Sequence, residues 1–366
     1  MEKVISFEAV GKFMVDVLAA AGIPLQDAAI VADSLLQADK FGFDSHGINR
    51  LKNIYLDRIK QGILNPVTKI EIVKEGLTTA VVDGHNGMGH VIAFNSMKLA
   101  IEKARKYGMG MVAVRNSTHY GFAGYYPLMA VRENMIGITG TNARPAIAPT
   151  FGVENMLGTN PLTFGIPSDE EFPFLLDCAT SIIQRGKVEL YARENKEMPA
   201  GWVIDENGES KTNSREVLHD LIAGHASLAP LGGIGEETGG YKGYGYAAVV
   251  EILSSALQQG SFLQMLTGFK DGKPVPYPLG HFFIVIDINS FTDIDSFKKT
   301  TGDILRELRA SKKMPGHDRI FTAGEKEFET WKARKDKGIT FSDQLLEEFR
   351  GLCKSYGLME YLHHFS

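Results

Sequence analysis

The sequence predicts an α/β (α+β) protein in which helices at both ends of the chain flank a central sheet. Three observations carry this prediction. Apolar residues recur at helical spacing over residues 6–42, short apolar and β-branched runs follow between residues 79 and 288, and charge-rich helical patterns return from residue 293. A chain of 366 residues also exceeds one ordinary hydrophobic core, so more than one packing unit is expected.

Two helices are predicted at the start of the chain. The apolar positions within 13–21 and within 28–36 each fall on one helix face. Gly22 suits the position just after the first helix, and Pro24 suits the first position of the second. Asp27 then lies in an early turn, where its negative charge complements the helix dipole.

The middle of the chain reads as strand, helix, strand. Residues 80–82 form a short β-branched run, residues 92–107 have helical spacing, and residues 110–114 are again apolar. This order predicts a parallel or mixed sheet with covering helices. Further apolar runs that extend the sheet lie at 136–139, 162–166, 174–176 and 282–288. Because these runs are continuously apolar, we expect strands that are buried on both faces.

Helical patterns return in the last part of the chain, at 294–310, 325–337 and 341–356. Each combines one apolar stripe with a charged face, which is typical of a helix packed on one side. We therefore predict one helical domain built from residues 1–76 and 293–366, and an α/β domain formed by residues 77–292.

The composition excludes several classes of partner. A formal net charge of −5 and a pI near 6.1 give no basic footprint for nucleic acid. The N-terminus lacks the zones of a signal peptide, and no apolar run approaches the roughly 20 residues that span a bilayer. The two cysteines, Cys178 and Cys353, form no CxxC and predict neither a disulfide framework nor a zinc site. We expect a soluble, cytoplasmic protein without a metal.

The first candidate site is the segment 44–50. Ser45, His46 and Arg50 supply a hydroxyl, a titratable ring and a planar cation that can hold a carboxylate by two parallel hydrogen bonds. Such a cluster suits an anionic substrate. The alternative is a capped helix start, with Ser45 as N-cap and Arg50 in a surface ion pair.

His119 is the second candidate. It follows the apolar run 109–114, and functional groups in open α/β sheets gather just beyond the carboxyl ends of strands. With an ordinary pKa of about 6.5, a histidine there can exchange a proton with a substrate hydroxyl. The alternative is a hydrogen-bonded histidine in a loop.

Asp177 is the third candidate, because it follows the apolar run 174–176. An acid at a strand end can orient a histidine or bind a ribose hydroxyl, and the alternative is a cap of the next helix. The turn-rich segments 140–145 and 156–161 can offer N–H groups, hydroxyls and amides to a cofactor, although such segments are commonly plain turns.

Two glycine-rich segments, 231–235 and 239–245, precede a predicted helix over 247–257. Glycines let backbone N–H groups approach a phosphate at a helix N-terminus, and Lys242 adds a positive charge; the alternative is a flexible surface loop. The sequence has neither standard nucleotide fingerprint, GxGxxG after a first strand or GxxxxGK[ST]. It also lacks HExxH and GxSxG, which disfavours a metalloprotease or a serine hydrolase.

Taken together and in order, these segments resemble the malate/L-lactate dehydrogenase family that is unrelated to the Rossmann malate dehydrogenases. That family also includes ureidoglycolate, sulfolactate and cyclic-imine-carboxylate oxidoreductases. The resemblance covers nearly the whole chain. The matching stretches are DSHGINR (44–50), DGHNGMG (83–89), the loop of Ser117 and His119, LGTNP (157–161), DCATS (177–181), PAGW (199–202), GYKGYG (240–245) and GHFF (280–283).

The resemblance implies a helical domain built from both termini, a non-Rossmann NAD(P)-binding domain around a mixed sheet, and a homodimer with its active site near the subunit boundary. It implies hydride transfer between NAD or NADP and a small 2-hydroxy or 2-oxo acid, malate or L-lactate foremost. Alternatives on the same scaffold are a cyclic-imine-carboxylate or a ureidoglycolate-type oxidoreductase. An alternative of another class is a nucleotide-binding homologue without catalysis.

The resemblance also implies roles for individual residues. His119 matches the family's proton-transferring histidine, while His46 and Arg50 match substrate-site residues. The positions that match cofactor contacts are Asn142, Ala143, Asp177, Cys178, Ala179 and Lys242, with His281 in a nearby segment. We therefore expect Arg50 to hold the substrate carboxylate and His119 to exchange the hydroxyl proton. His46 is expected, together with Asp177, to orient or polarise the reacting centre.

The chain departs from the family pattern at three places. Ile54 stands where family members usually have a tyrosine of the substrate site, and Tyr55 follows one position later. Ala143 replaces a common serine, which removes a hydroxyl that can bind the cofactor. At the adenosine end, residues 315–317 read Pro-Gly-His where Pro-Gly-Glu is common.

Overall fold

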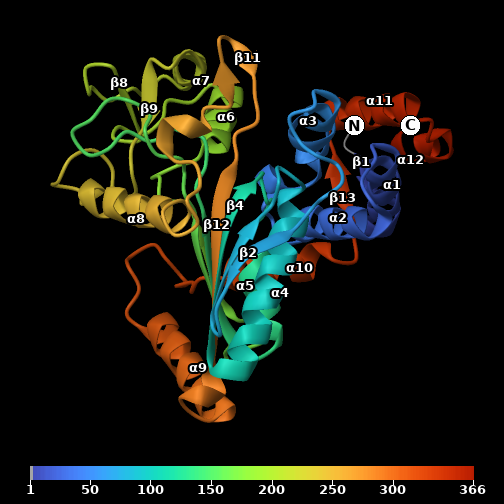
Figure 1. Ribbon diagram of the computed structural model, residues 1–366. Coiled ribbons are helices and arrows are strands. Elements are labelled where there is room, and N and C mark those ends of the chain that lie inside the picture. Colours follow the sequence, from blue (N-terminus) through green and yellow to red (C-terminus); the bar gives the residue numbers. More distant parts are fainter. Residues whose placement is uncertain (1–2) are drawn as a thin grey trace.

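A seven-stranded mixed sheet forms the centre of the molecule. The computed structural model describes residues 3–366, and Figure 1 shows the sheet between two groups of helices. The strand order is β2-β3-β4-β12-β5-β6-β7. The bounds are β2 (Glu71–Glu75), β3 (Thr79–Asp83), β4 (Met109–Ser117), β12 (Leu279–Asp287), β5 (Met135–Thr141), β6 (Leu162–Ile166) and β7 (Phe174–Cys178). Only β3 and β4 are parallel neighbours, and every other pair is antiparallel, so the predicted mixed sheet is confirmed.

The central strand β12 explains why its sequence is so apolar. Its residue Phe282 pairs with Ala113 of β4 on one side and with Gly140 of β5 on the other. Both Phe282 and Phe283 are buried, which places apolar side chains on both faces of the strand as predicted. Gly140 is required here, because a Cβ at that position would lie 2.5 Å from the Phe282 ring.

Two helices cover one face of this sheet. Helix α4 (Gly89–Tyr107) connects the parallel strands β3 and β4 and packs on β4 and β12. Helix α5 (Tyr125–Arg132) packs on β5 and β6 and also contacts α4, so the two helices share a face. Helix α4 ends at Gly108, whose φ of 84° is a left-handed conformation that favours glycine.

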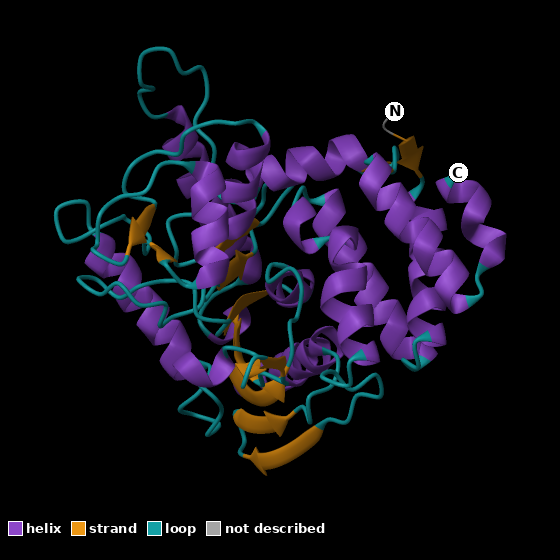
Figure 2. Cartoon of the chain, turned by 90° about the horizontal axis from the view of Figure 1, so that it is seen from above, coloured by secondary structure: helices purple, strands orange, loops and turns teal. Residues whose placement is uncertain are grey.

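Both chain ends build one helical unit beside the sheet. It contains α1 (Phe7–Ala20), α2 (Leu25–Lys40), α11 (Asp343–Tyr356), α12 (Leu362–Phe365) and the antiparallel pair of β1 (Lys3–Ile5) with β13 (Ile339–Phe341). Phe13 of α1 lies 5.4 Å from Phe349 and 5.0 Å from Phe365, measured between ring centroids. The two ends therefore share one aromatic core, and Figures 1 and 2 show N and C close together on this unit.

Two observations bear on the predicted domain limits, which stay a prediction. β2, which lies within the predicted segment 1–76 of the helical domain, is an edge strand of the sheet. Helix α9 (Ile294–Ala310) lies at the opposite end of the sheet from the helical unit (Figure 1), and residues 293–338 contribute nothing to the buried core of that unit. All five β2 residues are exposed, so no alternation marked the strand. The apolar stripe of α9 predicts that one face of the helix is packed, but it does not identify the element against which that face packs.

The predicted α/β domain contains a second, smaller core. It lies among α6 (Arg185–Arg193), α7 (Ser214–Ala223), α8 (Gly240–Leu253), β8 (Val203–Asp205) and β9 (Ala226–Leu228). A hairpin of β10 (Phe269–Lys270) and β11 (Lys273–Pro274) projects before β12. Within residues 3–366, no helix combines the length and the apolar character needed to cross a bilayer.

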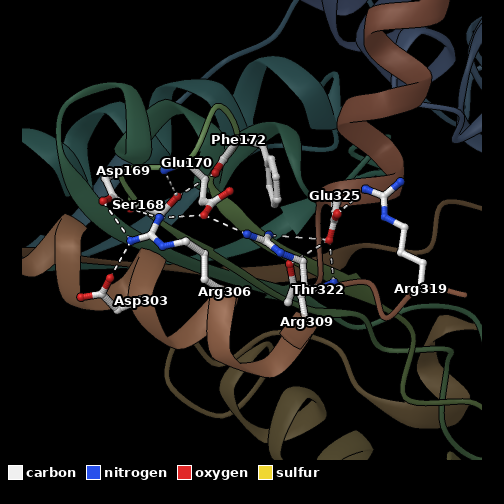
Figure 3. Close-up of polar contacts among 10 residues, drawn as sticks. All are labelled: Ser168, Asp169, Glu170, Phe172, Asp303, Arg306, Arg309, Arg319, Thr322 and Glu325. Carbon is white, nitrogen blue, oxygen red and sulfur yellow. Dashed lines mark hydrogen bonds and ion pairs between the residues drawn. The ribbon is translucent and has the colours of Figure 1, made fainter. Parts of the chain in front are cut away.

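An ion-pair network holds α9 and the following segment against the sheet edge (Figure 3). Arg306 of α9 pairs with Asp169 and Glu170 of the loop between β6 and β7. Arg309 pairs with Glu170 at 2.8 Å and lies over the Phe172 ring. Glu325, the first residue of α10 (Glu325–Arg334), is buried and pairs with Arg319. The network thereby joins three segments that are distant in the sequence.

Candidate active site

Three segments meet at a pair of histidines. His119 follows the carboxyl end of β4, as predicted, and His46 lies in the short helical turn η1 (Asp44–His46). Their rings stack with centroids 5.8 Å apart. The third segment is the first turn of α4, which brings His90 next to them. A Cβ at Gly89 would collide with the carbonyl oxygens of Thr118 and His119, so glycine permits this close approach.

The segment that carries His46 and Arg50 is held by a buried carboxyl group. Asp39, on α2, accepts a hydrogen bond of 2.9 Å from the N–H of Ile48. Its carboxylate fills the space that a Cβ on Gly47 would need. Burial raises the pKa of Asp39 to about 8. The Ser45 hydroxyl lies 2.8 Å from Nδ1 of His46, so it contacts the ring and makes no N-cap hydrogen bond.

A π-helical turn follows, η3 (Leu51–Leu56), and continues into α3 (Asp57–Lys60). Its signature is the hydrogen bond from the N–H of Asp57 to the carbonyl of Lys52. A π-turn takes up one residue more than an α-turn, and such turns are frequent at functional sites. Ile54 consequently packs against the helical core, while Tyr55 is fully buried beside His119. Tyr55, which stands one position later than the tyrosine of the family pattern, therefore still reaches the site.

The contacts of His119 concentrate on one ring nitrogen. Nδ1 lies 2.7 Å from the Tyr55 hydroxyl and accepts a hydrogen bond of 3.3 Å from the N–H of Gly121. The Tyr55 hydroxyl also lies 3.4 Å from Nε2 of His90. Burial lowers the pKa of His119 well below its ordinary value, with further lowering by His46, His90 and two arginines. Burial, followed by the charge of Arg50, also lowers the pKa of His46 to about 4, so both rings are neutral at pH 7.

Two arginines, Arg50 and Arg58, act on the histidines, and a third, Arg144, lies on the same tyrosine ring as Arg58. The charges of Arg50 and Arg58 both act on His119. The guanidinium of Arg58 lies 4.8 Å and that of Arg144 5.8 Å from the centroid of the Tyr277 ring. Arg50 donates through Nε to the carbonyl of Ser45. Among residues 3–366, no ion pair joins any of these three guanidiniums to a carboxylate, which leaves a positively charged site around neutral imidazoles.

Asp177 lies in β7 and makes different contacts. Its carboxylate accepts hydrogen bonds from the N–H of Gly124 at 2.7 Å and from the Thr163 hydroxyl at 3.2 Å. Burial raises the pKa of Asp177 to about 6. Asp177 thus ties the loop after His119 to the sheet, and its role at the reacting centre stays a prediction. Cys178 and Ala179 follow it, half-buried, at the end of β7.

Several residues predicted to contact the cofactor are engaged inside the protein. Asn142 accepts from the N–H of Gly280 at 2.8 Å and donates to the carbonyl of Ser261 at 3.0 Å. The N–H of Ala143 donates to the side chain of Asn160. His281 is fully buried, with its two nitrogens 2.7 and 2.8 Å from the hydroxyls of Thr141 and Ser117. These three residues shape the sheet edge, and their contact with a cofactor stays a prediction.

The glycine-rich segment packs its own backbone closely against the N-terminus of α8. Gly232, Gly233 and Gly239 have positive φ values of 99°, 94° and 84°. Gly239 is the N-cap of α8 and offers no side chain to cap the first turn, which contains exposed Lys242. The helix begins at Gly240, earlier than the predicted residue 247. A helix N-terminus with an adjacent ammonium suits the pyrophosphate of a dinucleotide, so the residue types of this segment fit that group, and the contact of Lys242 with a cofactor stays a prediction.

Sequence reasoning missed several residues of this site. Arg58 and Tyr277 lie in segments without a recognisable local pattern, and His90 directly follows the stretch 83–89 without being singled out. Glu251 of α8 is also buried, and it accepts from the side chain of Asn160 at 2.8 Å and from the N–H of Leu263 at 3.0 Å. It thereby fixes the loops that carry the predicted cofactor contacts, a role visible only from contacts between distant segments.

Known proteins are similar to this chain in sequence and in fold. The family model described as malate/L-lactate dehydrogenase matches residues 5–350. A malate dehydrogenase of Pyrococcus abyssi is 45% identical over 94% of this chain and 93% of its own. A malate/(S)-sulfolactate dehydrogenase of Methanothermus fervidus is 36% identical over 95% of this chain and 96% of its own.

Solved structures agree. The malate dehydrogenase of Entamoeba histolytica superposes with a TM-score of 0.93 at 47% identity, covering 98% of this chain and 99% of that one. The sulfolactate dehydrogenase of Methanocaldococcus jannaschii gives a TM-score of 0.86 at 36% identity, covering 97% and 98%. The chain therefore belongs to the malate/L-lactate dehydrogenase family and is an oxidoreductase that acts on the CH–OH group of 2-hydroxy acids.

Proposed function

We propose that this protein is a nicotinamide-dependent dehydrogenase whose substrate carries two anionic groups, a 2-hydroxy dicarboxylate of the malate type. The supporting observation is that Arg50 and Arg58 act on two neutral imidazoles, that Arg144 shares the Tyr277 ring with Arg58, and that none of the three guanidiniums forms an ion pair with a described carboxylate.

The three cations divide into two groups. Arg50 lies next to His46 in sequence and space, where it can hold the carboxylate beside the reacting carbon. Arg58 and Arg144 flank Tyr277 and form the second group. Lactate has a single carboxylate and leaves the second group unpaired, whereas malate supplies an anion to each. The second contact is expected to contribute about 1.5–3 kcal/mol, the usual range for a hydrogen bond to a charged group.

The nicotinamide, when bound, accepts the hydride from the substrate carbon or returns it. His119 exchanges the proton of the substrate hydroxyl, and His46, whose ring stacks on that of His119, helps to orient that group. The positive charges of Arg50 and Arg58 lower the pKa of His119. An anionic substrate between these arginines counteracts that field and raises the pKa of His119 toward the working range.

The test is a set of parallel assays with malate, L-lactate, ureidoglycolate and a cyclic imine carboxylate, each with both NAD and NADP. We expect kcat/KM for malate to exceed that for lactate by about tenfold to more than a hundredfold, the ratio that 1.5–3 kcal/mol corresponds to. Equal values for malate and lactate, or a preference for the imine, would contradict the dianionic substrate. The same assays determine the cofactor preference.

We also propose a homodimer, supported by the exposed apolar face of α8. Tyr241, Tyr246, Val249 and Ile252 are 46%, 56%, 47% and 57% exposed. A helix that is apolar on all sides requires a second partner besides its own core. Light scattering after gel filtration tests this, and Val249→Lys is expected to shift the protein toward a monomer. We retain the cytoplasm as the proposed compartment, in line with the free state of Cys178 and Cys353.

A further inference from the structure

We propose that the Tyr55 hydroxyl is a reversible hydrogen-bond partner of His119, donating to Nδ1 when that nitrogen is unprotonated and accepting from it when it carries a hydrogen. Tyr55 is then a positioning residue that acts through His119. The inference rests on the dehydrogenase function proposed above, because it concerns the proton that accompanies the hydride.

The surroundings of His119 fix its resting tautomer. Gly121 reaches Nδ1 through a backbone N–H, which can only donate. Nδ1 therefore presents its lone pair, and the Tyr55 O–H, at 2.7 Å, donates to the same atom. A neutral imidazole with an unprotonated Nδ1 carries its hydrogen on Nε2. Both hydrogen bonds that the described residues make with this ring go to Nδ1, so Nε2 is the nitrogen left for substrate.

Turnover requires the opposite arrangement at Nδ1. In reduction of a 2-oxo acid, hydride forms the new C–H bond, and the His119 imidazolium gives its Nε2 proton to the carbonyl oxygen. The ring that remains is neutral with hydrogen on Nδ1, and solvent later restores the lost proton. In oxidation the same Nδ1–H form takes the hydroxyl proton at Nε2. Gly121 cannot accept from Nδ1–H, so another acceptor is needed.

Only a group that both donates and accepts can serve both states, and a hydroxyl does this by rotation. The Tyr55 oxygen accepts from Nδ1–H, and its own hydrogen turns toward Nε2 of His90, 3.4 Å away. His90 is fully buried, and burial lowers its pKa to about 3, so it stays neutral. The Nδ1 atom of His90 has no hydrogen-bond partner among the described residues, so His90 joins the hydrogen bonding around His119 through its contact with Tyr55.

The π-turn holds the hydroxyl at this place. Leu51 and Leu56, at its two ends, are buried in the helical core, and the Tyr55 ring packs 4.9 Å from the His90 ring, measured between centroids. Phenylalanine at position 55 retains this packing and removes only the hydroxyl. The titratable and charged groups that face His119 are His46, Arg50, Tyr55 and Arg58 from the 44–60 segment and His90 from α4.

The experiment compares Tyr55→Phe with the native protein in both reaction directions between pH 5 and 10. We expect kcat to fall about tenfold to a hundredfold, the range for removing one partner of a charged hydrogen bond, while KM stays within about threefold. Reduction requires the imidazolium, and loss of its acceptor lowers the pKa of His119. The alkaline limb of kcat for reduction should therefore move down by about one pH unit.

Tyr361→Phe is the matched control, because it removes another buried tyrosine hydroxyl, which donates to Asp16 in the helical core. It should change neither kcat nor the pH profile. A Tyr55→Phe enzyme with native kcat and an unmoved alkaline limb would overturn the proposal, as would an equal loss in the control.

A second measurement does not depend on turnover. ¹⁵N-histidine NMR of the protein with bound tartronate, a 2-hydroxy dicarboxylate, reports the protonation of His119 directly. We expect its pKa to be about one unit lower in Tyr55→Phe than in the native protein. An unchanged pKa of His119 would overturn the role of Tyr55. This result does not depend on the proposed function, which would instead be contradicted if assays with every 2-hydroxy acid failed.

Discussion

The hydroxyl of Tyr55 lies 2.7 Å from Nδ1 of His119, although 64 positions separate the two residues in the chain. A single π-turn makes this contact possible, because it absorbs one extra residue between Arg50 and Tyr55. The position of Tyr55 is then set by α3, which follows it, and not by the number of residues that separate Tyr55 from Arg50.

Deleting exposed Asn53 should convert the π-turn into an α-turn and leave Tyr55 in place relative to α3. We expect kcat/KM of this deletion variant to stay within about threefold of the native value, because the deletion removes the one extra residue that the π-turn accommodates. Steady-state kinetics with malate measures it. A loss as large as that of Tyr55→Phe would show that the ring had moved.

Replacing His119 by alanine should lower kcat by about two to four orders of magnitude, the usual effect of losing a general acid or base. His119→Ala also leaves Tyr55 without its partner, so circular dichroism and the melting temperature must be recorded beside the kinetics. Turnover near the native rate in a folded variant would refute the assignment.

The two arginine groups should respond differently to mutation. Arg50→Lys keeps the charge and loses the bidentate fork, so KM should rise sharply for malate and lactate alike. Arg58→Met keeps most of the side-chain volume and removes the charge. Its kcat/KM for malate should fall about tenfold to a hundredfold, with lactate nearly unaffected. Parallel losses for both substrates in Arg58→Met would place Arg58 at the first carboxylate.

The pKa of Asp39, raised to about 8 by burial, predicts a pH-dependent stability. The folded protein favours the protonated acid, so this stabilisation is complete below the ordinary pKa and declines as the pH rises through about 8. Asp39→Asn keeps an acceptor for the N–H of Ile48 and cannot ionise. Its melting temperature should exceed the native one increasingly from pH 5 to 9. Parallel curves would show that Asp39 ionises in the fold without penalty.

Two glutamates pair with Arg319, and we expect them to have unequal roles: Glu325, which Figure 3 draws, and Glu329. Glu325 is 4% exposed and also accepts from the N–H of Thr322, whereas the Glu329 side chain is 46% exposed. We expect Glu325→Ala to reduce the free energy of unfolding by about 1–3 kcal/mol, because buried donors lose their acceptor. Glu329→Ala should change it by less than about 1 kcal/mol. Urea denaturation compares them.

Local patterns in the sequence predicted most of the elements. The periodicities over 92–107 and 294–310 correspond to α4 and α9, and the apolar run at 282–288 corresponds to the central strand β12. The strand-end position of His119 also followed from the residues alone. These features depend on which side of an element is buried, and burial leaves its mark on neighbouring residues.

Contacts between segments that are distant in the sequence produce no such local pattern. The order of strands in the sheet, the place of α9 and the exposed edge strand β2 came only from the tertiary structure. The same holds for the contact of Tyr55 with His119 and for the approach of His90 to both. A periodic apolar pattern predicts that one face of an element is buried, but it does not identify the element that buries it. The folded chain determines that partner, because many apolar surfaces look alike in the local sequence and long-range packing selects among them.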